Sequence, residues 1–257
     1  MSARHDDDQH GTAPQGRADL DFYFDPVCPF AWMTSTWVRE VQRQRGYRVS
    51  WRPVSLRLLN AAVDYEAQFP PEYEAGHTAG LRLLRVVERV RAEHGEDAVA
   101  RLYEALGARV FESAPLPSPA PGEPDVRGTA ELLVPLLDQL GLPADLAGTL
   151  EDDRWDEVVR AGTEEALSLA GRDVGTPVLH VDPPSGLAFF GPVISRRPTP
   201  EQAVELWDHV LGLARFPGFA ELKRSLRELP RLPGLGVAED ETGAVEDWHG
   251  GSRRQHR

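Results

Sequence analysis

The stretch Leu20-Asp21-Phe22-Tyr23-Phe24-Asp25-Pro26-Val27-Cys28-Pro29-Phe30-Ala31 contains the pattern that decides the fold. Every second side chain from Leu20 to Phe24 is strongly apolar, which is the period of a β-strand with one buried face. The acidic side chains of Asp21 and Asp25 are then expected to face solvent, and either would tune Cys28 only if it were buried. The stretch predicts a first strand that ends just before the cysteine.

Cys28 is followed by the signals of a helix and a second strand. Pro29 suits the first position of a helix, because a backbone N–H is not needed there. Apolar side chains recur at helical spacing over residues 30–41, and Gly46 is expected to end the helix. Alternation over residues 47–52 predicts the second strand. A helix that joins two strands of one sheet normally forms a right-handed parallel crossover, so we expect a β-α-β unit with Cys28 at the start of its helix.

The middle of the chain changes to helical periodicity. A proline-rich segment, residues 113–124, interrupts this block and is expected to be an exposed extended loop. The apolar stripes of four helices lie around this loop, over residues 81–90, 99–110, 132–140 and 155–167.

Strand signals return in the last third of the chain. Residues 177–181 and 187–190 are expected to form a hairpin, and the Thr199 and Gln202 pair is a capping-box signature for a final helix. The order β-α-β, helical block, β-β-α predicts an α/β protein with a thioredoxin-like fold split by an α-helical insertion. The expected parts are a disordered N-terminal tail (1–18), the first thioredoxin-like part (19–59), the helical insertion (60–171), the second thioredoxin-like part (172–230) and a disordered C-terminal tail (231–257).

Composition excludes several classes of partner. The net charge of −13 opposes binding to a phosphate backbone, so no nucleic-acid partner is expected. No apolar run approaches the length of a membrane span, and the first 18 residues lack the apolar core of a secretory signal. A single cysteine fits a reducing compartment and cannot build a multi-cysteine zinc site. We therefore expect a soluble cytoplasmic protein without a structural metal.

Cys28 is the candidate nucleophile. The free N–H groups of the first helical turn, those of Phe30 and Ala31, are expected to point towards its sulfur and to lower the pKa of the thiol. A buried structural cysteine is the alternative. Thr176-Pro177, at the start of a strand, is a candidate for a cis peptide bond that faces the thiol, with the backbone of Thr176 available to pair with a substrate or thiol ligand.

Taken together, these residues resemble the actinobacterial DsbA-like reductases that use mycothiol, including the mycothiol-dependent nitroreductase type. The resemblance extends from about residue 20 to residue 225. It is carried, in order, by Phe24–Phe30, Val54-Ser55-Leu56, Val174-Gly175-Thr176-Pro177 with His180-Val181, Phe189–Pro192 with Ser195-Arg196, Leu206-Trp207-Asp208 and Glu221–Arg224.

The resemblance implies a thiol-disulfide oxidoreductase with Cys28 as its catalytic residue, and with Pro29, Phe30, Ala31, Thr176 and Pro177 around the bound thiol or substrate. The family commonly has Cys-Pro-Trp-Cys, whereas this chain has Ala31 in place of the second cysteine. What remains is a monothiol cycle, in which a low-molecular-weight thiol, mycothiol in this family, resolves a mixed disulfide on Cys28. The thiol would be a co-substrate, and no tightly bound cofactor is expected.

Two other functions are compatible with the same fold. Kappa-class glutathione transferases and chromene-carboxylate isomerases bind a thiol cofactor without two protein cysteines, although they place a serine where this chain has Cys28. A non-catalytic binding protein could also retain the fold, since fold does not imply function. The substrate, a disulfide or an electrophilic small molecule, is not encoded in these motifs. Exposed apolar stripes on the insertion would be compatible with a homodimer.

Overall fold

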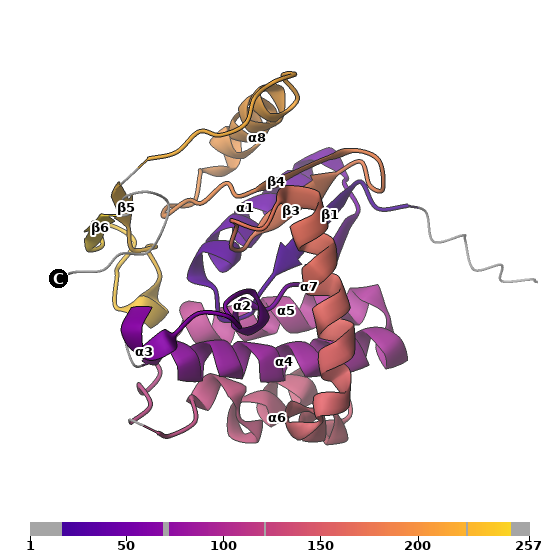
Figure 1. Ribbon diagram of the computed structural model, residues 1–257, viewed down its shortest axis with the longest axis vertical. Helices are drawn as coiled ribbons and strands as arrows, with labels where there is room; N and C mark the ends of the chain where they lie inside the picture. The colour runs from indigo at the N-terminus through magenta and orange to yellow at the C-terminus, as the bar shows by residue number, and fades with distance from the viewer. Residues whose placement is uncertain (1–16, 69–71, 121, 225, 248–257) are drawn as a thin grey trace, which may run out of the picture.

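The computed structural model describes residues 17–68, 72–120, 122–224 and 226–247 (Figure 1). Its strands are β1 (Leu20–Phe24), β2 (Val49–Pro53), β3 (Val178–Val181), β4 (Leu187–Phe190), β5 (Leu226–Glu228) and β6 (Val245–Asp247). Its α-helices are α1 (Pro29–Arg45), α2 (Leu56–Leu59), α3 (Tyr65–Gln68), α4 (Glu72–His94), α5 (Glu96–Phe111), α6 (Ala130–Gln139), α7 (Asp156–Ala170) and α8 (Pro200–Ala214). Short 3-10 helices are η1 (Val126–Gly128), η2 (Ala144–Glu151), η3 (Asp153–Trp155) and η4 (Pro233–Leu235).

The central sheet has the strand order β2-β1-β3-β4. Strands β1 and β2 are parallel and joined by α1, whereas β1 with β3 and β3 with β4 are antiparallel. Helices α4, α5 and α6 are inserted between β2 and β3 and lie together below the sheet, while α8 lies at the far end of the view and packs on α1 (Figure 1). This topology confirms the predicted thioredoxin-like fold split by a helical insertion.

Strand β1 is buried on both of its faces. The apolar face, with Phe22 and Phe24, packs against β2 and α5, whereas Tyr23 on the other face packs with Ala166 of α7. The expectation that Asp21 and Asp25 face solvent is therefore wrong: the two residues are 9% and 0% exposed. The alternation in one strand does not reveal that helices from elsewhere in the chain cover its second face.

The helical insertion packs its apolar stripes inward. The predicted stripe of α6 is buried at Leu132, Leu133, Leu136 and Leu137. The stripes of α4 and α5 likewise join the main core cluster. The apolar surface that suggested a homodimer is thus largely used within the chain.

Local signals placed several helix ends where the structure has them. Pro29 is the first residue of α1, and Gly46 caps this helix in the left-handed conformation with φ of 70°. Both hydrogen bonds of the capping box between Thr199 and Gln202 are formed at the start of α8. The proline-rich segment, outside the short stretch that is not described, has no helix or strand over residues 115–120.

The end of the chain differs from the expected disordered tail over residues 231–257. Leu232 and Val237 are 0% and 6% exposed, and η4 lies between them. Gly234 sits so close to α5 that a Cβ there would be 2.2 Å from the carbonyl oxygen of Val110. A few apolar side chains in a polar segment are enough to hold it on the core, while residues 248–257 lie outside the described part.

None of the helices in the described ranges is long and apolar enough to cross a lipid bilayer.

Gly107 of α5 allows the ring of Trp32 to lie directly on the helix backbone, because a Cβ there would be 2.1 Å from Cε3 of Trp32. We expect Gly107→Ala to lower the free energy of unfolding by about 1–3 kcal/mol through overpacking. Gly212→Ala is the matched control, since that glycine lies in α8 and a Cβ added to it would have no neighbour within 4 Å. There alanine should raise the free energy by up to about 1 kcal/mol. Urea unfolding followed by circular dichroism measures both, and equal effects would contradict the packing argument.

Candidate active site

Cys28 is the N-cap residue of α1. Its Sγ accepts a hydrogen bond from the backbone N–H of Ala31 at 3.4 Å, so one of the two amides expected at the sulfur is in place. The positive end of the helix and this N–H both favour the thiolate form. On its other side, Sγ donates to the backbone carbonyl of Thr176 at 3.5 Å, a contact that only the protonated thiol can make. These two neighbours of the sulfur therefore favour opposite protonation states.

The turn at Thr176-Pro177 faces the sulfur. The peptide bond between these residues is cis. Oγ1 of Thr176 donates to the backbone oxygen of Tyr23 at 3.1 Å, which ties the turn to β1. Thr176 is 4% exposed, and Pro177 is also buried. The chain thus brings Cys28 and Thr176, separated by 148 residues, into contact.

The remaining candidate residues, Pro29, Phe30 and Ala31, are the first three residues of α1. Pro29 and Phe30 are half-buried, and Phe30 packs against the main core cluster. Ala31 is fully buried, so its methyl group contacts protein interior where the family has a second thiol. Cys28 itself is 6% exposed and belongs to the buried core cluster.

Asp25, which the sequence pattern placed towards solvent, is buried next to the cysteine turn, residues 25–28. Its Oδ1 accepts the backbone N–H of Val27 at 3.0 Å, and its Oδ2 accepts that of Leu56 at 2.8 Å. Its own carbonyl oxygen accepts the N–H of Cys28 at 3.0 Å. Burial raises the pKa of Asp25 from its ordinary value of 3.8 to about 7, while the two N–H donors and the charge of Arg127 act in the opposite direction. A carboxyl that changes charge near neutral pH thus lies beneath the cysteine turn.

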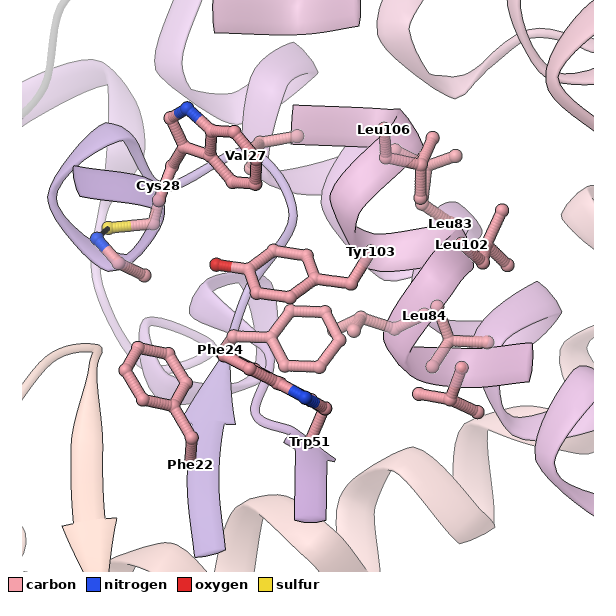
Figure 2. Packing of buried hydrophobic residues seen from close by; sticks show 14 of the residues in the cluster. Phe22, Phe24, Val27, Cys28, Trp51, Leu83, Leu84, Leu102, Tyr103 and Leu106 are labelled. Atoms are coloured by element: carbon pink, nitrogen blue, oxygen red, sulfur yellow. Dashed lines mark hydrogen bonds between the residues drawn. The ribbon is translucent and has the colours of Figure 1, made fainter. Parts of the chain in front are cut away.

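Tyr103 connects the helical insertion to the site. Its ring stacks on Phe24 with centroids 3.7 Å apart and meets the ring of Trp32 edge-on at 5.8 Å. Figure 2 shows Tyr103 reaching from α5 across Phe24, with its hydroxyl group directed to the side on which Cys28 lies. Burial is the main reason that the pKa of Tyr103 lies above its ordinary value, and the nearby charges of Cys28 and Asp25 raise it further. Tyr103 therefore remains a neutral hydroxyl in the pH range of interest.

Two further contacts brace the first turns of α1. Nε1 of Trp32 donates to Oε1 of Glu112 at 2.5 Å, and Arg197 forms an ion pair with the same carboxylate. Oγ1 of Thr34 donates to the backbone oxygen of Pro192 at 2.8 Å. The insertion and the segment after β4 thus hold α1 from both sides.

A cavity of about 730 Å³ lies between the start of α4 and the proline-rich segment. Its walls include Glu72, Thr78, Arg82 and Asp125, and Cys28 is not among the lining residues. No cluster of three or more side chains suited to bind a metal occurs within the described ranges.

Comparison with protein families identifies the chain. The Rv2466c-like family, described as mycothiol-dependent nitroreductase Rv2466c, matches residues 27–224, which include Cys28, the insertion and the Thr176-Pro177 turn. The chain belongs to this family of DsbA-like, mycothiol-linked proteins, as the resemblance in its motifs implied. Membership supports a thiol-dependent oxidoreductase in general.

Individual relatives are more distant. An uncharacterised protein of Mycobacterium tuberculosis, Rv2286c, is 31% identical over 205 residues, which cover 80% of this chain and 81% of that protein. The cytosolic disulfide reductase DsbM from Pseudomonas aeruginosa has 15% identity and a TM-score of 0.45, covering 76% of this chain and 99% of DsbM. DsbA from Proteus mirabilis, a disulfide oxidoreductase, has 14% identity and a TM-score of 0.42, covering 77% and 87%. The function is therefore inferred from the family and from the site.

The raised pKa of Asp25 predicts a pH-dependent stability. Because the folded carboxyl holds its proton up to about pH 7 and the unfolded one only to about pH 4, this group lowers the free energy of unfolding as pH rises between those values. The loss is at most about 4 kcal/mol, at roughly 1.4 kcal/mol per pKa unit. Asp25→Asn should flatten this slope, and Asp138→Asn, an exposed change on α6, should not. Urea unfolding at pH 4.5 and 7.5 tests this, and equal slopes in all three proteins would contradict it.

Proposed function

We propose that this protein is a cytoplasmic thiol-disulfide oxidoreductase that acts by a monothiol mechanism through Cys28, with mycothiol as the low-molecular-weight thiol. One observation carries the proposal: Sγ of Cys28 lies between the N–H of Ala31 and the carbonyl of Thr176. A thiolate at a helix N-terminus is a good nucleophile, and a backbone carbonyl before a proline can accept a hydrogen bond from an extended ligand. Both features suit exchange of sulfur partners.

The reaction begins with the Cys28 thiolate attacking one sulfur of a substrate disulfide. A Cys28–substrate mixed disulfide forms, the substrate S–S bond breaks, and the first substrate thiolate leaves and takes a proton from solvent. The thiolate of mycothiol then attacks the Cys28 sulfur and releases the second substrate thiol, leaving mycothiol on Cys28. A second mycothiol thiolate attacks this bound mycothiol, which restores Cys28 and releases mycothiol disulfide. One substrate disulfide is reduced, and two mycothiols are oxidised.

Because residue 31 is alanine, a thiol from solution is needed to resolve the mixed disulfide on Cys28. With one cysteine in the whole chain, no second protein thiol can displace the substrate. The N–H of Ala31 still supports the sulfur, so the change removes the resolving group without removing the helix-end contact. A family that uses mycothiol supplies the missing thiol from solution.

Incubation with mycothiol disulfide should add one mycothiol to the wild-type protein, detected by intact mass spectrometry. An excess of reduced mycothiol should remove the adduct at a rate proportional to its concentration, because resolution is bimolecular. Cys28→Ser should form no adduct. Noncovalent binding of mycothiol or glutathione together with isomerase or transferase activity would instead favour the alternative enzyme class. Full biological effect of Cys28→Ala would favour a non-catalytic binding protein.

Ala31→Cys should convert the site to a dithiol. The new thiol would belong to the residue whose backbone N–H contacts Sγ of Cys28, and it should displace a mixed disulfide intramolecularly. The adduct should then disappear without added thiol, with a mass loss corresponding to an internal disulfide. If, without added thiol, the adduct lasted as long on this variant as on the wild type, the assigned role of position 31 would be wrong.

A further inference from the structure

We propose that Asp25 is a positioning residue for Cys28, because it holds the cysteine turn, residues 25–28, against α2. In the same arrangement, position 80 of α4 must be glycine to leave room for the Asp25 carboxyl. The inference deepens the proposed function, since it concerns the geometry of the same sulfur. It is carried by contacts of the described residues.

The carboxyl of Asp25 holds two segments at once. Oδ1 accepts the N–H of Val27, the residue immediately before Cys28, and Oδ2 accepts the N–H of Leu56, the first residue of α2. Asp25 is 0% exposed, so both bonds form away from water. A hydrogen bond to a carboxyl buried away from water is strong. An N–H donor left there without an acceptor lowers the free energy of unfolding. The side chain therefore fixes the turn relative to the helix that follows β2.

The main chain of Asp25 adds a third bond. Its carbonyl oxygen accepts the N–H of Cys28 at 3.0 Å, which closes a tight turn between the strand and the helix. Cys28 in turn begins α1, with its carbonyl oxygen accepting the N–H of Trp32 at 3.0 Å. The main chain and the side chain of Asp25 thus both hold the turn that sets the direction of the Cys28 side chain.

Helix α4 presses on this turn at Gly80. A Cβ at Gly80 would lie 2.5 Å from Oδ1 of Asp25 and 2.8 Å from Cγ2 of Val27. Both distances are far shorter than a normal contact, so only glycine permits this approach. Through Gly80, the helical insertion determines where the carboxyl and the cysteine turn can lie.

The two backbone donors at this position require a carboxyl and are not both satisfied by an amide of the same size. Asparagine would offer one oxygen and one NH2 group, whereas the site presents two N–H donors. Burial raises the pKa of Asp25, and the charge of Arg127 of η1 acts to lower it. Burial also raises the pKa of Tyr65 of α3 and of Tyr103 of α5, and the charge of Asp25 raises both further. Cys28 lies on the same turn, His77 of α4 is hydrogen-bonded to Tyr65, and Asp125 forms an ion pair with Arg127. Only the full acceptor set of aspartate satisfies both donors.

The test measures the second-order rate of Cys28 with 4,4′-dithiodipyridine, a small disulfide, between pH 5 and 9. Asp25→Asn and Gly80→Ala should each slow the reaction at pH 7 about tenfold or more, because misplacing a reacting atom by a fraction of its size is costly. Asp138→Asn and Gly212→Ala are the matched controls at exposed positions and should react within twofold of wild type. Circular dichroism and urea unfolding verify that each variant is folded under the assay conditions.

The pH profile separates positioning from general destabilisation. Wild type should show two inflections, one from the thiol and one from Asp25, and Asp25→Asn should retain only that of the thiol. Folded Asp25→Asn and Gly80→Ala proteins that react at the wild-type rate with the wild-type profile would overturn the proposal. Should neither variant fold, a wild-type profile with a single inflection would overturn it, and one with two would support it. The probe is not mycothiol, so failure of the proposed function would appear separately, as a missing mycothiol adduct on the wild type.

Discussion

The stacking of Tyr103 on Phe24 is the contact on which the position of the helical insertion relative to the sheet depends. Phe24 is the last residue of β1, and Tyr103 comes from the middle of α5, so one pair of rings joins the sheet to the insertion. The ring of Trp51 from β2 adds a third member at 5.5 Å from Tyr103. Aromatic pairs of this kind add to the free energy of ordinary apolar burial and prefer defined geometries. The insertion is therefore fixed against the strand that leads directly into the reactive turn.

The end of β1 concentrates the constraints that follow from this contact. Within four residues the chain passes from a buried strand through a carboxyl with two backbone donors to a helix N-cap. The Thr176 turn closes the same region from the second half of the fold. Segments from both halves and from the insertion meet here, so the sulfur is held by the whole fold rather than by its own loop.

Local signals predicted the elements, while long-range packing decided the details of the site. The alternation in Leu20–Phe24, the position of Pro29 and the capping box at Thr199 are short-range features, and each is present in the structure. The approach of Thr176 to Cys28 followed from the order of elements. Burial of Asp25 did not, because α2 and α4, which enclose it, belong to later parts of the sequence. In the sequence, Tyr103 likewise appears only as one member of an apolar helical stripe, because the rings that it contacts are distant in the chain.

The packing around Leu232 bears on where the C-terminal boundary of the folded domain lies. The family match stops at residue 224, yet Leu232 is fully buried and Gly234 lies against the backbone of α5. A boundary drawn at the end of the match would pass through interior packing instead of a linker and would uncover the C-terminal turn of α5. In this chain, the segment that follows the family match therefore helps to close the core beside α5.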